Sequence, residues 1–166
     1  MADLTQNLEE WEDTQKGKYL TFVVEDEVYG IEIRYVTEII GIQPITKVPE
    51  SSDYIRGIIN LRGKIIPVMD VRLKFRKPGI AYNDRTCIIV VDIGTIGIGL
   101  IVDNVAEVLD IPDEQIVPPP DSKSGFNSRY IMGIGKVGND IKLILDCRKL
   151  VTSEELETLE DMAART

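Results

Sequence analysis

The side chains that could do chemistry in this chain are few, and their spacing argues mainly against catalysis. Histidine is absent, which removes the commonest general base and metal ligand. Asp70 and Asp146 occupy matching places in two similar segments and could form a carboxylate pair, but an acid that ends a strand more often caps the following turn. Cys87 and Cys147 lie in separate apolar runs, so we expect two buried, reduced thiols rather than a disulfide or metal ligands.

Motifs that bind phosphate or activate a nucleophile are also absent. The chain has no P-loop, no GxGxxG after a strand and no GxSxG. Gly94, Gly97 and Gly99 alternate with apolar residues, which is typical of a β-bulge or a closely packed strand rather than a phosphate cradle. We therefore expect no catalytic residues, no metal and no cofactor.

Arg62 is the most promising binding residue, because it lies at the tip of a predicted hairpin. Apolar, strand-like runs flank Arg62-Gly63, and glycine accepts the positive φ of a tight turn. An exposed turn arginine with no binding role is the plain alternative. Arginine can also hold a carboxylate through two parallel hydrogen bonds, and Glu38 is a suitable partner. We favour an anchoring role for this pair.

The elements that must position these residues occur twice along the chain. Residues 52–58 match residues 128–134, and Asp70-Val71-Arg72 matches Asp146-Cys147-Arg148, both with an offset of 76. Upstream, residues 36–40 match residues 105–109 with an offset of 69. The strand pattern repeats, but the hairpin tip around Arg62 does not. A tandem duplication of one five-strand unit, of the size of a small barrel or sandwich, is predicted.

The predicted organisation has four parts. A flexible acidic arm spans residues 1–18, a first β subdomain 19–85, a second 86–151, and an amphipathic helix 152–166. Thr152 and Glu155 have the spacing of a capping box at the start of that helix. A helix over residues 32–40 is an open alternative to the third strand, because the apolar residues there also have helical spacing. The two subdomains should pack together and leave a groove, which the equivalent residues Val36 and Val105 would line.

Composition excludes several classes of protein. The 166 residues are 43% hydrophobic, which is enough for a core, but only 6% aromatic, and the net charge is −9. An acidic balance with no basic face argues against a nucleic-acid partner. The sequence shows no signal peptide and no apolar run long enough to span a bilayer, so we expect a cytoplasmic location without membrane insertion.

Residues 55–72, IRGIINLRGKIIPVMDVR, closely resemble the signature of CheW-like domains, and residues 29–39 are similar to the opening strands of that family. The match extends over about residues 19–150. The resemblance implies an all-β fold of two intertwined SH3-like five-stranded barrels, related by internal duplication, plus the C-terminal helix. It also implies a non-catalytic chemotaxis adaptor that couples the cytoplasmic helical tips of chemoreceptors to the histidine kinase CheA, and that is recruited to membrane-associated signalling arrays.

The resemblance further implies positions for the binding sites. A receptor groove between the barrels should include five apolar residues: Leu20, Ile33, Val36, Ile39 and Val105. Glu38 and Arg62 match the polar pair of the family, and Gly57 matches a glycine beside the coupling surface. The surface for the homologous regulatory domain of CheA is placed around Gln43, Ile45 and Lys47.

Two other classes remain as alternatives. A small β-barrel enzyme or ligand-binding protein would need a deep polar pocket with perturbed titratable groups. A nucleic-acid-binding barrel would need exposed aromatic side chains and a basic groove, which this composition does not favour.

Overall fold

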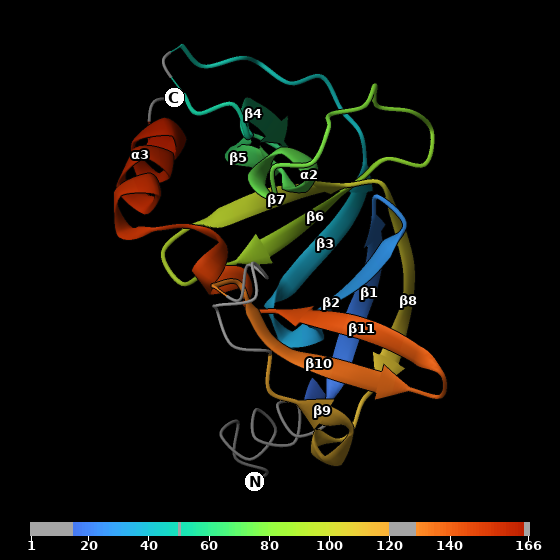
Figure 1. Cartoon of the computed structure of the whole chain (residues 1–166). Coiled ribbons are helices and arrows are strands. Elements are labelled where there is room, and N and C mark those ends of the chain that lie inside the picture. Colours follow the sequence, from blue (N-terminus) through green and yellow to red (C-terminus); the bar gives the residue numbers. More distant parts are fainter. Residues whose placement is uncertain (1–14, 50, 120–128, 165–166) are drawn as a thin grey trace, which may run out of the picture.

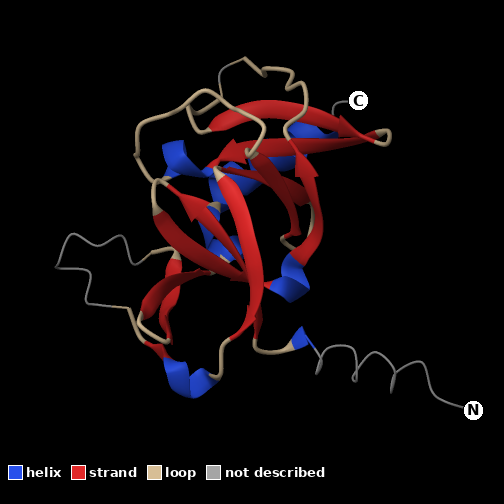
Figure 2. Cartoon of the chain, turned by 90° about the vertical axis from the view of Figure 1, so that its right-hand side faces the viewer, coloured by secondary structure: helices blue, strands red, loops and turns tan. Residues whose placement is uncertain are grey.

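Two β-sheets make up most of the structure (Figures 1 and 2), a computed structural model that describes residues 15–49, 51–119 and 129–164. The six-stranded sheet has the order β8-β1-β2-β11-β10-β9. Its strands are β1 (Lys18–Val24), β2 (Glu27–Glu32), β8 (Asn104–Asp110), β9 (Ile116–Val117), β10 (Ile131–Val137) and β11 (Asp140–Leu145). In the view of Figure 1 this sheet occupies the lower part of the molecule.

The five-stranded sheet has the order β3-β6-β7-β5-β4 and lies in the upper part of Figure 1. Its strands are β3 (Val36–Gly41), β4 (Ile55–Leu61), β5 (Lys64–Asp70), β6 (Cys87–Asp92) and β7 (Gly97–Val102). The described helical segments are η1 (Ile33–Tyr35), α2 (Val71–Lys74), η2 (Asp113–Gln115), η4 (Cys147–Leu150) and α3 (Ser153–Ala164). The predicted all-β class with a C-terminal helix is confirmed.

Each sheet closes through the chain that leaves one of its edge strands. After β3, Thr46 forms a bridge with Ile58 of β4, the opposite edge of the same sheet. After β8, Ile116 and Val117 of β9 pair with β10 in the same way. This closure turns each set of strands into the predicted barrel, and it leaves few unpaired backbone groups at the edges.

The barrels do not coincide with the two halves of the sequence. The repeat makes β1 and β2 equivalent to β6 and β7, yet β1 and β2 lie in the sheet with β8, β10 and β11, while β6 and β7 lie with β3, β4 and β5. The expected subdomains 19–85 and 86–151 are therefore wrong as barrel boundaries, although the two barrels are correct. Each half gives its first hairpin to the barrel of the other half, so the boundary at residue 85 falls inside one sheet.

The exchange depends on two equivalent parallel contacts. Gly30 of β2 is opposite Ile144 of β11, and Gly99 of β7 is opposite Val68 of β5. A Cβ atom on Gly99 would lie 2.7 Å from the Ile88 side chain and 2.8 Å from the Val68 side chain. The close-packing interpretation of this glycine is thus confirmed, because the absence of a side chain lets the exchanged hairpin lie against the other half.

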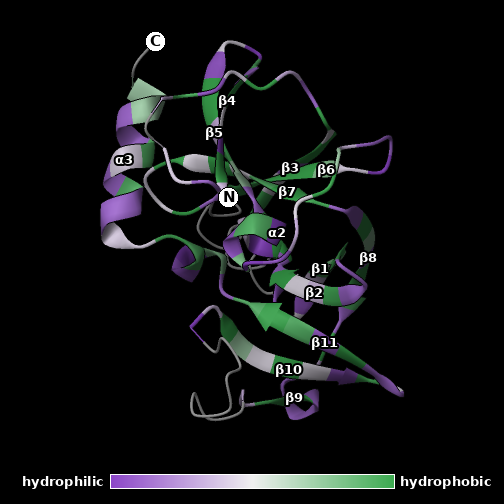
Figure 3. Ribbon diagram, turned by 45° about the horizontal axis from the view of Figure 1, so that its top comes forward, coloured by the Kyte–Doolittle hydropathy of each residue, from purple (hydrophilic) through white to green (hydrophobic). Residues whose placement is uncertain are grey.

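One large core cluster joins the two barrels. It contains residues of both sheets, with Phe22 and Tyr29 from one and Ile89 and Leu100 from the other, all at most 3% exposed. The strands in Figure 3 are accordingly coloured mainly as hydrophobic, whereas α3 alternates between hydrophobic and hydrophilic residues. Two smaller clusters lie within single barrels, but the largest cluster is built from both sheets, so separating the barrels would expose apolar residues of each.

Helix α3 is fixed by a cluster of buried polar contacts. The Lys74 side chain is 5% exposed, and its Nζ lies 3.1 Å from the Glu155 carboxylate and 4.3 Å from the centre of the Tyr54 ring. Tyr54 also donates a hydrogen bond to Glu155. The predicted capping box is present, since the Glu155 amide donates to Thr152 Oγ1 and the Thr152 amide to the Glu155 carboxylate. These contacts and the burial of Leu159 and Met162 hold the helix against its barrel.

The turn caps, residues 32–40, the two thiols and the N-terminal arm were also predicted from the sequence. The Asp70 and Asp146 carboxylates accept hydrogen bonds from the amides of Leu73 and Arg148, as expected for turn caps. Residues 32–40 form the short turn η1 followed by a strand rather than a helix. Both thiols are free, but Cys87 is only half-buried. Of the N-terminal arm, residues 1–14 lie outside the described residues, and Lys18 already belongs to β1.

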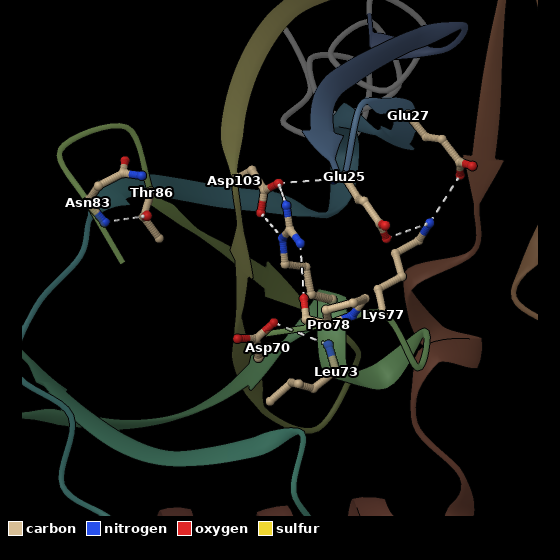
Figure 4. A network of polar contacts seen from close by, with 10 residues as sticks. Glu25, Glu27, Asp70, Leu73, Lys77, Pro78, Asn83, Thr86 and Asp103 are labelled. Atoms are coloured by element: carbon tan, nitrogen blue, oxygen red, sulfur yellow. Dashed lines mark hydrogen bonds and ion pairs between the residues drawn. The ribbon is translucent and has the colours of Figure 1, made fainter. Parts of the chain in front are cut away.

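A charged cluster joins α2 to the turn before β8. Arg72 donates from Nε to Asp103 Oδ1 at 2.7 Å and from Nη2 to Asp103 Oδ2 at 2.6 Å, and the two side chains are 13% and 20% exposed. Asp103 also accepts from the Glu25 amide at 2.9 Å, and Lys77 lies between Glu25 and Glu27 (Figure 4). Burial raises the pKa of Asp103, but the hydrogen bonds and charge of Arg72 outweigh burial and lower it.

We predict that Asp103→Asn lowers the free energy of unfolding by about 2 kcal/mol at neutral pH, because the half-buried Arg72 loses its counter-charge. Since folding lowers the pKa of Asp103, its contribution is present above the unfolded-state value of about 4 and is lost as the pH falls through the folded-state value. Urea unfolding of both proteins at pH 7 and pH 3 should therefore show a difference that shrinks in acid. The exposed Asp84→Asn is the control, and an equal loss in that variant would contradict the prediction.

Candidate partner-binding surfaces

The two equivalent valines lie at corresponding places of the two barrels. Val36 begins β3 and pairs with Val91, and Val105 lies near the start of β8 and pairs with Phe22. Both valines are half-buried and pack against the shared core, as does Ile33 of η1. Both β3 and β8 are terminal strands in their sheets. The side chains of Ile33, Val36 and Val105 therefore keep part of their surface open to solvent.

Leu20 does not share this exposure. It lies inside β1, opposite Ile31 and Val108 of the neighbouring strands, and is only 2% exposed. Its expected place on the surface of a groove is wrong, because β1 is an interior strand whose side chain at this position points into the core. Leu20 can support the groove from below but cannot touch a partner.

Ile39 is exposed, and the structure adds a residue that sequence reasoning missed. Ile39 is 44% exposed on β3, and its repeat equivalent Val108, on β8, is 52% exposed. The same offset of 69 that relates Val36 to Val105 relates these two residues, so the repeat contained the signal for Val108. Ile39 and Val108 are thus two large apolar side chains at matching exposed positions of the two barrels.

Arg62 and Glu38 form the expected ion pair. The φ angles of Arg62 and Gly63 are +52° and +85°, as in a type I′ turn, and the Asn60 side chain accepts from the Gly63 amide at 2.8 Å. This turn directs Arg62 towards β3, where Nη1 and Nη2 donate to Glu38 at 2.8 and 2.5 Å. The hydrogen bond from Arg62 lowers the pKa of Glu38. Arg62 remains 72% exposed, so the pair presents a fixed guanidinium to solvent.

The backbone geometry at residue 57 explains why a glycine is present there. Its φ is +138°, and a Cβ atom there would lie 2.0 Å from the carbonyl oxygen of Thr46. Thr46 and Ile58 exchange two backbone hydrogen bonds of 2.9 Å at this point. Gly57 is therefore required where the barrel closes, and it fixes the path of the segment that contains Gln43 and Lys47.

The three residues expected at the kinase surface lie together. Gln43, Ile45 and Lys47 line one hollow of about 220 Å³ with Arg56 and Tyr82. The hydroxyl of Tyr82 donates to Asp70 at 2.8 Å, and burial together with this hydrogen bond raises the pKa of Tyr82. The hollow thus combines apolar, amide and cationic groups at the end of the five-stranded barrel.

Acidic side chains and thiols are the potential metal ligands and nucleophiles in the part of the chain that the structure describes. No group of three or more histidine, cysteine, aspartate or glutamate side chains in that part of the chain could hold a metal ion. Burial raises the pKa of the Cys147 thiol to about 12, which makes it a poor nucleophile. No helix within the described ranges is long and apolar enough to cross a bilayer.

Two exchanged barrels with exposed apolar and charged surfaces define a protein-binding scaffold. A family model described as CheW-like domain matches residues 18–155, and the chain belongs to this family. It is 36% identical to the chemotaxis protein CheW of Klebsiella aerogenes over 91% of each chain, and 31% identical to CheW of Treponema pallidum over 89% of each. The crystal structure of the scaffolding protein TtCheW from Thermoanaerobacter tengcongensis is 37% identical, with a TM-score of 0.78 over 84% of this chain and 96% of the other.

These likenesses identify a chemotaxis scaffold, or adaptor, rather than an enzyme. The alternative of a small β-barrel enzyme is thereby set aside.

We predict that Gly57→Ala destabilises the fold by about 2–4 kcal/mol, because alanine combines an unfavourable φ with a clash against Thr46. Gly63→Ala is the matched control. Gly63 also has a positive φ but has open space around its Cβ position, so its loss should be only about 1 kcal/mol. Chemical unfolding of both variants measures the difference, and equal losses would show that the close approach to Thr46 is not what requires glycine.

Proposed function

We propose that this adaptor couples the cytoplasmic helical tip of chemoreceptors to the histidine kinase CheA through two separate surfaces. The observation that carries the proposal is the placing of Val36 and Val105. These equivalent residues, one from each barrel, rest half-buried on the same core cluster. A surface built symmetrically from two barrels suits a hairpin of two amphipathic helices, which binds through regularly spaced apolar anchors.

The receptor groove in this proposal has four of the expected residues and one addition. Ile33, Val36, Ile39 and Val105 contact the receptor helices, and Val108 extends the surface on β8. Leu20 supports it from the core. Glu38 and Arg62 lie beside Ile39 on the same edge of the five-stranded barrel, where a fixed guanidinium can select a carboxylate or carbonyl of either partner.

The kinase surface in this proposal is the end of the five-stranded barrel. Gln43, Ile45 and Lys47 lie on the segment that closes the barrel, and Gly57 fixes that segment. The regulatory domain of CheA is itself a CheW-like domain by the resemblance described above, so a barrel end meeting a barrel end would bury similar apolar surfaces. Binding to receptors and kinase at once would recruit the protein to receptor arrays at the cytoplasmic face of the membrane.

The experiment that tests the coupling function is a pair of calorimetric titrations. The full chain is titrated with a chemoreceptor cytoplasmic fragment and, separately, with the regulatory domain of CheA. Saturable binding to both, with NMR shifts near Val36 for the receptor and near Ile45 for the kinase, supports coupling. Binding to neither by the folded protein would overturn it.

For the groove, we predict that Val36→Glu weakens receptor binding at least tenfold while binding of the CheA domain is retained. The reason is that a carboxylate would be desolvated without a partner in an apolar contact. Ile141→Glu is the control, since Ile141 is 62% exposed on the tip of the β10–β11 hairpin, away from β3. Ile39→Ser serves as a second groove variant, because Ile39 is exposed and its replacement does not disturb the core. Unchanged receptor affinity in folded Ile39→Ser and Val36→Glu proteins would refute the groove.

For the polar anchor, we predict that Arg62→Ala lowers receptor-dependent kinase activation several-fold and leaves the melting temperature nearly unchanged. An exposed ion pair adds little to stability, so the loss should appear in assembly rather than in folding. Arg62→Lys keeps the charge but loses the paired hydrogen bonds, and intermediate activation is expected. A large drop in melting temperature would contradict this prediction and show that the role of Arg62 is structural.

A further inference from the structure

The internal repeat creates two equivalent junctions, and they differ in charge at one matching position. The offset of 76 relates Arg72 to Arg148, and the offset of 69 relates Asp103 to Arg34. At the first junction Arg72 and Asp103 form the two-hydrogen-bond ion pair described above. At the second junction the position of the aspartate is occupied by a second arginine. The two copies therefore differ in charge at the same place in the fold.

The second junction brings its two arginines to one aromatic ring. The guanidinium carbon of Arg34 lies 4.8 Å from the centre of the Tyr35 ring, and that of Arg148 lies 5.2 Å from it. Their side chains are 56% and 57% exposed, whereas Arg72 at the first junction is 13% exposed. Two like charges on one ring are held at the surface, where an incoming anion can reach them.

Nearby acids neutralise this junction only in part. Glu32 accepts from Arg34 Nε at 2.6 Å, and Asp146 lies 3.5 Å from Arg148 Nε. Beside Arg148, a hollow of about 790 Å³ is lined by two more cations, Arg129 and Lys149, and by one acid, Glu154. This face thus has a surplus of positive charge in a chain whose net charge is −9.

We propose that Arg34, Tyr35 and Arg148 bind a carboxylate side chain on a helix of the chemoreceptor. The inference rests on the proposed receptor function, because Tyr35 directly precedes the groove residue Val36. On a helix, residues three or four apart are neighbours about 5–6 Å apart, so an acid one turn from the side chain that packs on Val36 reaches the arginines. The bound carboxylate adds to the partial neutralisation by Glu32 and Asp146, at a junction where an arginine stands at the position equivalent to Asp103. Guanidinium groups suit this role because each can donate two parallel hydrogen bonds.

The test is calorimetric titration of the full chain with a chemoreceptor cytoplasmic fragment at low and moderate salt. Arg148→Gln should weaken binding about two- to fivefold, and Arg148→Glu about tenfold, with a smaller salt dependence than the wild type. Lys136→Glu makes the same kind of charge change at an exposed position of β10. Its affinity for the receptor fragment should stay within about twofold of the wild-type value. Arg34→Asp copies the first junction by removing one arginine and placing a carboxylate at the position equivalent to Asp103, and it should also lose affinity while remaining folded.

A receptor fragment whose acidic tip residues are converted to amides completes the test. With that fragment, Arg148→Glu should cause little further loss, since the interaction is already absent. Wild-type affinity in Arg148→Glu, together with weak binding in Val36→Glu, would overturn the carboxylate site and leave the groove in place. Unchanged affinity in both variants would instead overturn the proposed receptor function.

Discussion

The exchange of hairpins between the two halves is the constraint on which the rest of the structure depends. Each barrel is completed by two strands from the other half, through parallel contacts at Gly30 and Gly99. The halves cannot separate without opening both barrels. Hence the largest core cluster is built from both barrels, and the junctions between barrels are fixed features rather than movable interfaces.

This arrangement explains the positions of the two surfaces that we propose for binding. Exchange places β3 and β8 as terminal strands that begin at the shared core, so Val36 and Val105 are held rigidly while part of each side chain stays exposed. Barrel closure then uses the segment after β3, which fixes Gln43, Ile45 and Lys47 at the other end of the same barrel. A rigid scaffold with two surfaces loses little conformational entropy when it binds two partners.

Departures from the internal symmetry mark the positions with specific tasks. Both copies keep the glycine at the closure point and the aspartate that caps the turn after the hairpin, because backbone geometry requires them. The copies differ at the hairpin tip, where only the first has Arg62, and at the junction where Arg34 replaces the equivalent of Asp103. A charge present in only one copy can serve an internal ion pair, as Asp103 does with Arg72, or an external partner, as we propose for Arg62 and Arg34.

The sequence by itself determined the elements and their duplication. Alternation of apolar residues, the Arg62-Gly63 turn and the Thr152 capping box are local signals, and the strands, the I′ turn and α3 formed where these signals placed them. Even the Glu38–Arg62 pair could be anticipated, since the predicted turn exposed an arginine and the resemblance matched both residues to the polar pair of the family.

Only the tertiary structure decided how the elements combine. The repeat is equally compatible with two barrels side by side and with exchanged hairpins, because strand pairing across the halves uses the same local sequences. This ambiguity put the boundary at residue 85 inside a sheet. The burial of Leu20, which the resemblance had placed in the groove, the exposure of Val108 and the meeting of Arg34 with Arg148 were decided in three dimensions, since exposure and contacts between distant segments depend on which strands become neighbours.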